Sequence, residues 1–255
     1  MTISVPRLRL LEVERYERPV KLRLPVRFGV VTLREAPQLF LRVRIKLVDG
    51  REGEGVSAEL LVPKWFDKAP ELTNEDNFNQ LRRAVAIAQR HMMNAGEQTA
   101  FGISAAANAG HRKECAEAGL NGLVASFGVA VIERAIIDAL GRLERVPAAA
   151  LVRGNRLGIG TVLTPDLAGF DLNKFLAGVK PAASIFARHT VGLVDAITRA
   201  DTQGKRLDDG LPESLEEVIA AYGHVYFKLK VGGDVAADIE RLAQIATVLD
   251  RASAP

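Results

Sequence analysis

The chain of 255 residues carries 34 Lys and Arg against 31 Asp and Glu, so its formal net charge is only +3. Most arginines alternate with glutamates instead of gathering on one element, which argues against a nucleic-acid-binding protein. Hydrophobic residues make up 48% of the chain, which is enough for one or two domains with a core.

The cysteine content and the lengths of the apolar runs indicate the cellular compartment of the protein. The only cysteine, Cys115, has no partner for an internal disulfide and fits a reducing compartment. Residues 1–20 carry charges throughout and lack the apolar stretch of a secretory signal. The sequence contains no uninterrupted run of about 18 apolar residues, so no membrane span is predicted. We therefore expect a cytoplasmic protein that does not interact with a membrane.

The first sixty residues are predicted to form β-structure. Polar and apolar residues alternate in two segments, and the turn signal Asp49-Gly50 predicts a hairpin between the second segment and a return strand. The three predicted strands cover residues 7–14, 39–48 and 51–58. Two loops of functional length are expected beside them, at residues 25–30 and at 61–70, where Trp65 lies.

Helical spacing of apolar residues follows. Three helices are predicted, at residues 74–94, 104–118 and 126–143. Thr73 or Asn74 is available to cap the first, and Gly96 marks its end. Glu133 and Asp138 in the third helix are interpreted as capping or inter-domain hydrogen-bond partners rather than as catalysts.

The last part of the chain changes to alternating strands and helices. Residues 190–197 are nearly all apolar, as expected for a strand that is buried on both faces. A helix at 212–222, a strand at 225–231 and a helix at 235–249 are predicted next. This order indicates a parallel sheet, but it amounts to two βα units, whereas an eight-stranded barrel needs about 200 residues.

Two lysines in the second of these strands are the first candidates for chemistry. Lys228 and Lys230 are two residues apart, so they share one face of the strand at its carboxyl end. Burial and a neighbouring cation both disfavour the protonated form of a lysine, and a general base must lose that proton. The alternative is that both ammonium groups simply reach solvent.

Four segments together resemble a known family. They are the N-terminal strands, Gly53-Glu54-Gly55 after the hairpin, the helical residues 131–140, and Lys228-Leu229-Lys230 followed by Gly232-Gly233-Asp234. In this order they resemble the enolase superfamily, in its mandelate racemase/muconate lactonizing enzyme branch. The resemblance implies an α+β capping domain followed by a modified TIM barrel of the (β/α)7β type, incomplete in this chain. The implied domains are residues 1–145, a connecting segment 146–187, and the first two βα units at 188–255.

The resemblance also implies a reaction. Members bind Mg²⁺ through three carboxylates on later barrel strands and remove the proton α to a substrate carboxylate, which leads to racemisation, epimerisation, cycloisomerisation or dehydration. Lys230 matches the usual base and Lys228 its companion. The implied substrate is a small carboxylate: an acid sugar, an amino-acid derivative or a cycloisomerisable acid. Phe28, Gly29, Ser57 and Trp65 belong to the loops that select it.

The chain departs from the family pattern because no residues match the three Mg²⁺ ligands. Asp234 and Asp238 lie in a turn and on a helix, not at strand ends, so they do not replace them. We therefore expect the chain alone to be inactive, and its open strand edges predict a homo-oligomer. Two alternatives stay open: a non-catalytic binding or assembly protein built on a partial barrel, and a small α/β protein whose lysine pair is a surface feature.

Overall fold

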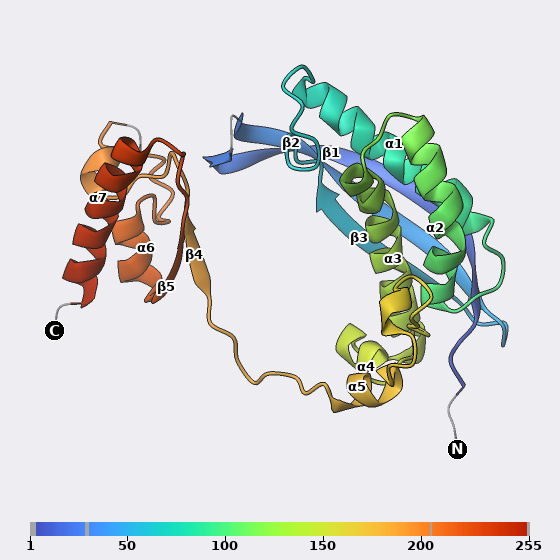
Figure 1. Cartoon of the computed structure of the whole chain (residues 1–255). Coiled ribbons are helices and arrows are strands. Elements are labelled where there is room, and N and C mark those ends of the chain that lie inside the picture. Colours follow the sequence, from blue (N-terminus) through green and yellow to red (C-terminus); the bar gives the residue numbers. More distant parts are fainter. Residues whose placement is uncertain (1–3, 29–30, 205, 254–255) are drawn as a thin grey trace. The chain divides into compact units, whose positions relative to one another are not determined.

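The computed structural model describes residues 4–28, 31–204 and 206–253. The chain forms two compact units, drawn in Figure 1. The first contains Met1–Val20 and Ala36–Pro181, and the second contains Lys21–Glu35 and Ala182–Pro255. The second unit is therefore discontinuous in sequence, which no pattern in the sequence predicted. The predicted domain boundaries after residues 145 and 187 stay predictions.

A three-stranded sheet begins the chain. Its strands are β1 (Leu8–Phe28), β2 (Val31–Leu47) and β3 (Glu52–Leu60), in the order β1-β2-β3. Strand β2 pairs antiparallel with β3, with Val43 opposite Gly55. Leu41, Val43 and Ile45 are buried while the arginines between them are exposed, as the alternation of the sequence requires. The predicted Asp49-Gly50 turn joins β2 to β3.

Strand β1 is much longer than we predicted. It continues to Phe28, so the prediction of a loop at 25–30 is wrong for residues 25–28, and Gly29 and Val30 lie outside the described residues. Basic and apolar residues alternate at Lys21-Leu22-Arg23-Leu24 and again at Val26-Arg27, which suits a strand that only Pro25 interrupts. Pro25 is tolerated because β1 lies at the edge of the sheet, where a missing N–H costs little.

Three helices of the first unit pack together and against the sheet (Figure 1). They are α1 (Asn74–Met93), α2 (Ala100–Glu117) and α3 (Gly122–Glu144). Thr73 and Asp76 form a capping box at the start of α1, and Asn121 caps α3. Helix α3 lies so close to β3 that a Cβ atom added to Gly55 would collide with the backbone of Ala135 and Ala139.

The remaining elements of the first unit are short. They are α4 (Ala148–Arg153), the 3-10 helix η1 (Pro165–Leu167) and α5 (Leu172–Gly178). Leu151 and Leu176 are buried and attach α4 and α5 to the unit. Within the described residues, no helix is long and apolar enough to cross a membrane.

The second unit contains two βα repeats. Its elements are β4 (Arg188–Val191), the 3-10 helix η2 (Arg199–Thr202), α6 (Leu215–Tyr222), β5 (Tyr226–Leu229) and α7 (Val235–Ser253). Strands β4 and β5 are parallel, as predicted. Their helix-facing side chains join a core of Val191, Ile197, Leu215, Ile245 and Val248.

The first of these strands is shorter than predicted. It ends at Val191, and the prediction of a strand over 190–197, buried on both faces, is wrong. The carboxylate of Asp195 accepts a hydrogen bond from the Gly192 backbone N–H at 2.7 Å, which turns the chain directly after the strand. Arg241 of α7 fixes this turn by donating to the carbonyls of Gly192 and Asp195 at 2.6 and 2.9 Å.

Candidate functional site

The two predicted catalytic lysines lie at the carboxyl end of β5. Lys228 pairs with Thr190 of β4, and the backbone N–H of Lys230 donates to the Val191 carbonyl at 3.1 Å, so the ladder extends one residue beyond the strand. Phe227 and Leu229 pack on the core against the helices. Because side chains alternate along a strand, Lys228 and Lys230 share the opposite face. Lys228 is exposed and Lys230 is half-buried.

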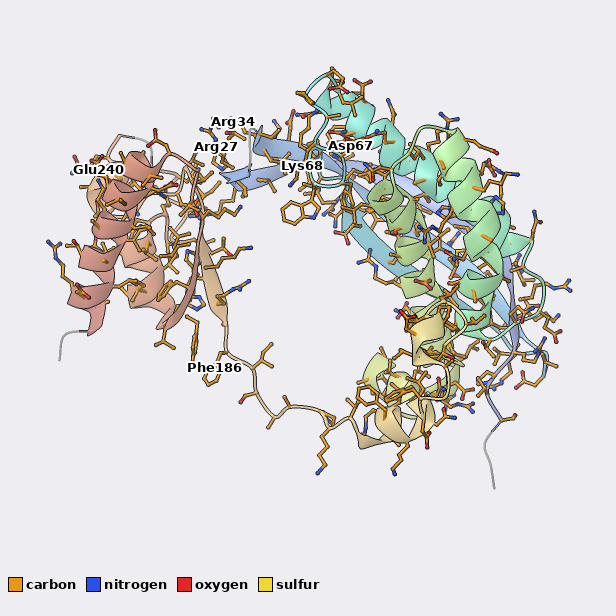
Figure 2. The ribbon with its side chains drawn as sticks, viewed as in Figure 1. Arg27, Arg34, Asp67, Lys68, Phe186 and Glu240 are labelled. Carbon is orange, nitrogen blue, oxygen red and sulfur yellow. The ribbon has the colours of Figure 1, made fainter. Side chains whose placement is uncertain are left out.

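The hairpin tip, residues 21–28 of β1 and 31–35 of β2, contacts this end of the strand through Arg27. The ammonium Nζ of Lys230 donates to the backbone carbonyl of Arg27 at 3.2 Å. Arg27 and Arg34 lie on the two strands of the tip (Figure 2). A main-chain oxygen thus restricts the position of the Lys230 ammonium group.

One arginine anchors the tip. Both oxygens of Asp209 accept hydrogen bonds from the guanidinium of Arg23 at 2.6 Å. The same guanidinium donates to the carbonyls of Leu211 and Pro212, each at 3.0 Å. The hydrogen bonds from Arg23 lower the pKa of Asp209 to about 2. Sequence reasoning missed this pair because the two residues are 186 positions apart and neither stands in a recognisable motif.

The turn that follows Lys230 is held by two aspartates. The carboxylate of Asp238 accepts from the backbone N–H groups of Gly232 and Gly233 at 2.7 and 2.8 Å. Asp234 accepts from the first N–H groups of α7, at Ala236 and Ala237. Both carboxylates thus hold the turn and the start of the helix.

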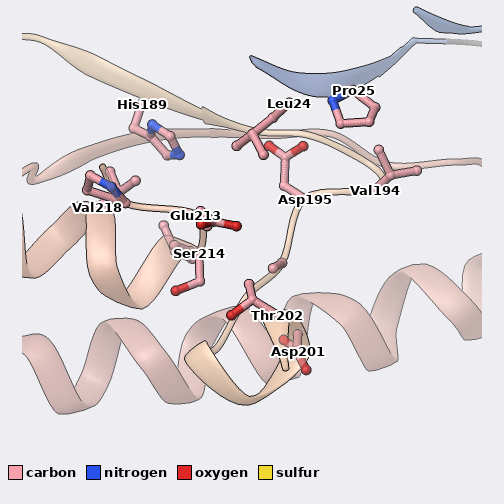
Figure 3. Close-up of a pocket in the computed structure, with 13 residues that line it drawn as sticks. Leu24, Pro25, His189, Val194, Asp195, Asp201, Thr202, Glu213, Ser214 and Val218 are labelled. Atoms are coloured by element: carbon pink, nitrogen blue, oxygen red, sulfur yellow. The ribbon is translucent and has the colours of Figure 1, made fainter. Parts of the chain in front are cut away.

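A cavity of about 230 Å³ lies in the same unit, between Leu24 and Pro25 of the hairpin and the loops around α6 (Figure 3). Three acidic residues line it, but their carboxylates accept backbone hydrogen bonds: Asp195 from Gly192, Asp201 from Ile197 and Thr198, and Glu213 from Leu207. His189 also lines it, and burial lowers the pKa of its ring. These polar groups stabilise the loops that carry the strand ends.

The other predicted site residues are placed differently. Phe28 is the last residue of β1. Its side chain and the whole of Gly29 lie outside the described part of the chain. Ser57 and Trp65 belong to the first unit. The Ser57 hydroxyl donates to the Val131 carbonyl of α3 at 2.6 Å, whereas Trp65 is 55% exposed. Phe66, its neighbour, packs edge-on against Phe127.

The described residues do not fit a magnesium site. In residues 4–28, 31–204 and 206–253, no three His, Cys, Asp or Glu side chains lie where they could hold one metal ion. Mg²⁺ needs several oxygen ligands around it. Asp234 and Asp238, which follow the lysines in the chain, already accept hydrogen bonds from backbone N–H groups.

Comparison with known proteins connects this arrangement to a fold. No family model and no curated protein matches the chain. It is similar to an enolase from the alpha proteobacterium BAL199 with bound magnesium (TM-score 0.54, 18% identity, covering 97% of this chain and 53% of that one). It is also similar to a mandelate racemase/muconate lactonizing protein from Herpetosiphon aurantiacus (0.52, 18%, 95% and 51%) and to a muconate lactonizing enzyme from Pseudomonas fluorescens complexed with muconolactone (0.51, 15%, 96% and 51%).

These identities establish the fold and leave the activity to be tested. The chain spans about half the length of the structures it matches. The fold class predicted from the sequence is confirmed. The protein has the fold of the enolase and mandelate racemase/muconate lactonizing enzyme structures, with an α+β capping domain followed by βα units of a modified TIM barrel.

Proposed function

We propose that this chain forms the capping domain and the lysine-bearing strand of a Mg²⁺-dependent enzyme of the enolase superfamily, in its mandelate racemase/muconate lactonizing branch. The observation that carries the proposal is the position of Lys228 and Lys230 at the carboxyl end of a parallel strand, on the face opposite the helices. Barrel enzymes carry their active sites at this end of the strands. The likeness in fold to a muconate lactonizing enzyme complexed with muconolactone supports a small carboxylate as the substrate.

The proposed chemistry gives the two lysines separate roles. Lys230, as the neutral amine, accepts the proton from the carbon α to the substrate carboxylate and becomes an ammonium group, and the Arg27 carbonyl orients its Nζ by accepting a hydrogen bond from it. Lys228, on the same face, attracts the carboxylate by charge. The reaction is a racemisation, epimerisation, cycloisomerisation or dehydration, hence an isomerase or lyase activity. Mg²⁺ is proposed for the whole enzyme only.

The 255-residue chain alone is proposed to be inactive. A proton α to a carboxylate is far too weakly acidic for a lysine amine to remove without further stabilisation of the enediolate, and the described residues supply no metal site for it. We expect no solvent deuterium at the α-carbon when the purified chain is incubated in D₂O with Mg²⁺ and mandelate, an acid sugar or a dipeptide. Measurable exchange that disappears in Lys230→Ala would refute inactivity and support the role of Lys230 as base.

The carboxylate-binding role is tested separately. Saturation-transfer NMR with mandelate detects weak binding, and we expect Lys228→Met to reduce the signal at least about threefold, as for loss of a partly exposed charge. Lys113→Met is the matched control, because Lys113 is exposed on α2 and lies near Glu117. Equal signals from the wild type and the Lys228 variant would contradict the role.

Further parts of the proposal concern contacts and assembly. Trp65 is kept as a substrate contact because over half of its side chain is exposed, and Phe28, Gly29 and Ser57 stay proposed with it. Homo-oligomer formation is supported by exposed apolar side chains in the second unit, among them Phe186, labelled in Figure 2, at 77% and Val225 at 73%. The cytoplasm is the proposed compartment. Sedimentation of the purified chain tests self-association, and a monomer would overturn it.

A further inference from the structure

An apolar pocket in the first unit contains one acidic side chain. It has a volume of about 190 Å³ and is formed by α2, α3 and the loop after α4. Among the described residues its walls are Ala100, Phe101, Ile136, Ile137, Leu157 and Ile159, and Glu133 is the only charged residue that lines it. Helices α2 and α3 pack side by side in this unit (Figure 1).

Glu133 is chemically unusual for a half-buried carboxylate. Within the described part of the chain it has no hydrogen-bond or ion-pair partner. Arg134, the next residue in the helix, already pairs with other groups: its guanidinium donates to the Glu59 carboxylate at 2.8 Å and to the Ala58 carbonyl at 3.4 Å. Removing a carboxylate from water without a partner is unfavourable, so this group attracts a cation.

The wall opposite the helix is fixed in place. Asn155 bonds to both the N–H and the carbonyl of Ile159, at 2.7 and 3.0 Å. The Phe101 N–H donates to the Leu157 carbonyl at 2.9 Å, which joins the loop to the start of α2. The pocket is therefore formed before any ligand arrives, and a ligand need not order it.

We propose that this pocket binds a small organic cation, an ammonium group carried on an aliphatic body. The aliphatic part packs against the isoleucines and Leu157, the ammonium group pairs with Glu133, and the ring of Phe101 offers a second attractive surface for a cation. The pocket is smaller than the 300 Å³ or so at which drug-sized sites begin, so the ligand is a single alkyl chain. A free alkylamine and a lysine side chain of another polypeptide share this chemistry.

The test compares ligands of equal length that differ in charge. Titration calorimetry on the full chain with hexylammonium, hexanol and hexanoate is expected to give hexylammonium at least about a fivefold advantage over hexanol, as for a partly exposed ion pair. Hexanoate is expected not to bind. In Glu133→Gln the advantage disappears, whereas Glu117→Gln, an exposed glutamate of α2, keeps it. Equal binding of hexanol and hexylammonium, or an advantage that survives Glu133→Gln, overturns the proposal.

A second variant fills the site from within. Ile137 lies four residues after Glu133 on α3, so Ile137→Lys brings an ammonium group next to the carboxylate along the helix. Hexylammonium binding is expected to be lost while the circular dichroism of the folded chain is kept, and continued binding refutes the site. An Nα-acetyl-lysine amide that competes with hexylammonium assigns the cation to a polypeptide side chain, and one that does not compete assigns it to a free amine. Either result requires the Glu133 site.

Discussion

Strand β3 and helix α3 are in close contact at Gly55. We therefore expect that adding a single methyl group at this position, as in Gly55→Ala, lowers the free energy of unfolding strongly. A methyl group at this position would overlap the Ala135 carbonyl and the Ala139 N–H, which are backbone atoms inside a helix and cannot turn away as a side chain could. Either the helix moves off the sheet or the strand bends. Overpacking of this kind destabilises proteins by about 1–3 kcal/mol.

The size of the effect in a melting experiment follows from the size of the unit. For units of 150–250 residues, 1 kcal/mol shifts the melting temperature by roughly 2–4 °C, so Gly55→Ala is expected to lower it by about 4–8 °C if the loss is about 2 kcal/mol. Thermal unfolding followed by far-ultraviolet circular dichroism measures this.

The matched control is Gly122→Ala, at the first residue of α3. A Cβ atom there meets nothing within 4 Å, and alanine is the better helix former by up to about 1 kcal/mol. We expect this variant to be as stable as the wild type or more so. A Gly55→Ala variant that melts at the wild-type temperature would show that β3 and α3 do not pack this closely at Gly55.

Four further predictions follow from hydrogen bonds and burial. His111 is buried, with Nε2 2.9 Å from the Ala125 carbonyl, and desolvation lowers its pKa. Because the unfolded chain then binds a proton at this histidine more readily than the folded chain, the free energy of unfolding in urea should fall as the pH drops from 7.5 through 6.5. The fall should be smaller in His111→Gln. Asp209→Asn should expose the hairpin tip to trypsin, because Arg23 loses its charged partner, and unchanged digestion would argue against the anchor. Since the pKa of Asp209 is lowered to about 2, the anchor should persist from neutral pH down to about pH 3 and be lost as the pH falls through 2. Thr73→Ala removes the capping box of α1 and should cost about 1 kcal/mol in denaturant unfolding, while Thr73→Ser should keep most of it.

Local patterns predicted most of the secondary structure. The helices α1 to α3 were predicted because their apolar stripes repeat every three or four residues, although α2 and α3 begin four residues earlier than predicted. Both helices start early because Thr99 and Asn121 cap them. These two residues can be recognised as caps only in the folded chain, where their side chains accept hydrogen bonds from backbone N–H groups of the first turn.

Two strand ends were predicted wrongly, and only one of these errors involves a contact between distant residues. The apolar run after Val191 predicted a strand, but the Asp195 carboxylate and Arg241 of α7 turn the chain there. The hairpin tip was predicted as a loop, and it is a strand up to Phe28. Apolar periodicity does not report on such hydrogen bonds.

The candidate site was predicted in part for the same reason. The position of Lys228 and Lys230 follows from strand alternation and from the Gly-Gly turn behind them, both of which are local. The Arg27 carbonyl and Arg23, the partner of Asp209, come from a segment 203 and 186 positions before the residues that they contact. The Glu133 pocket likewise exists only because the loop at 155–159 folds back onto α3.

The discontinuous second unit has a consequence for how the chain folds. The hydrogen bond between Lys230 and Arg27 closes a loop of 203 residues, and closing a flexible loop of that length costs about 4–5 kcal/mol beyond the constant for any closure. Val20 of β1 and Ala36 of β2 both belong to the first unit, so folding of that unit brings together the two ends of the hairpin segment between them. The second unit should therefore gain its full set of contacts late, after the first is formed, and a fragment that starts at residue 182 should lack a part of its own structure.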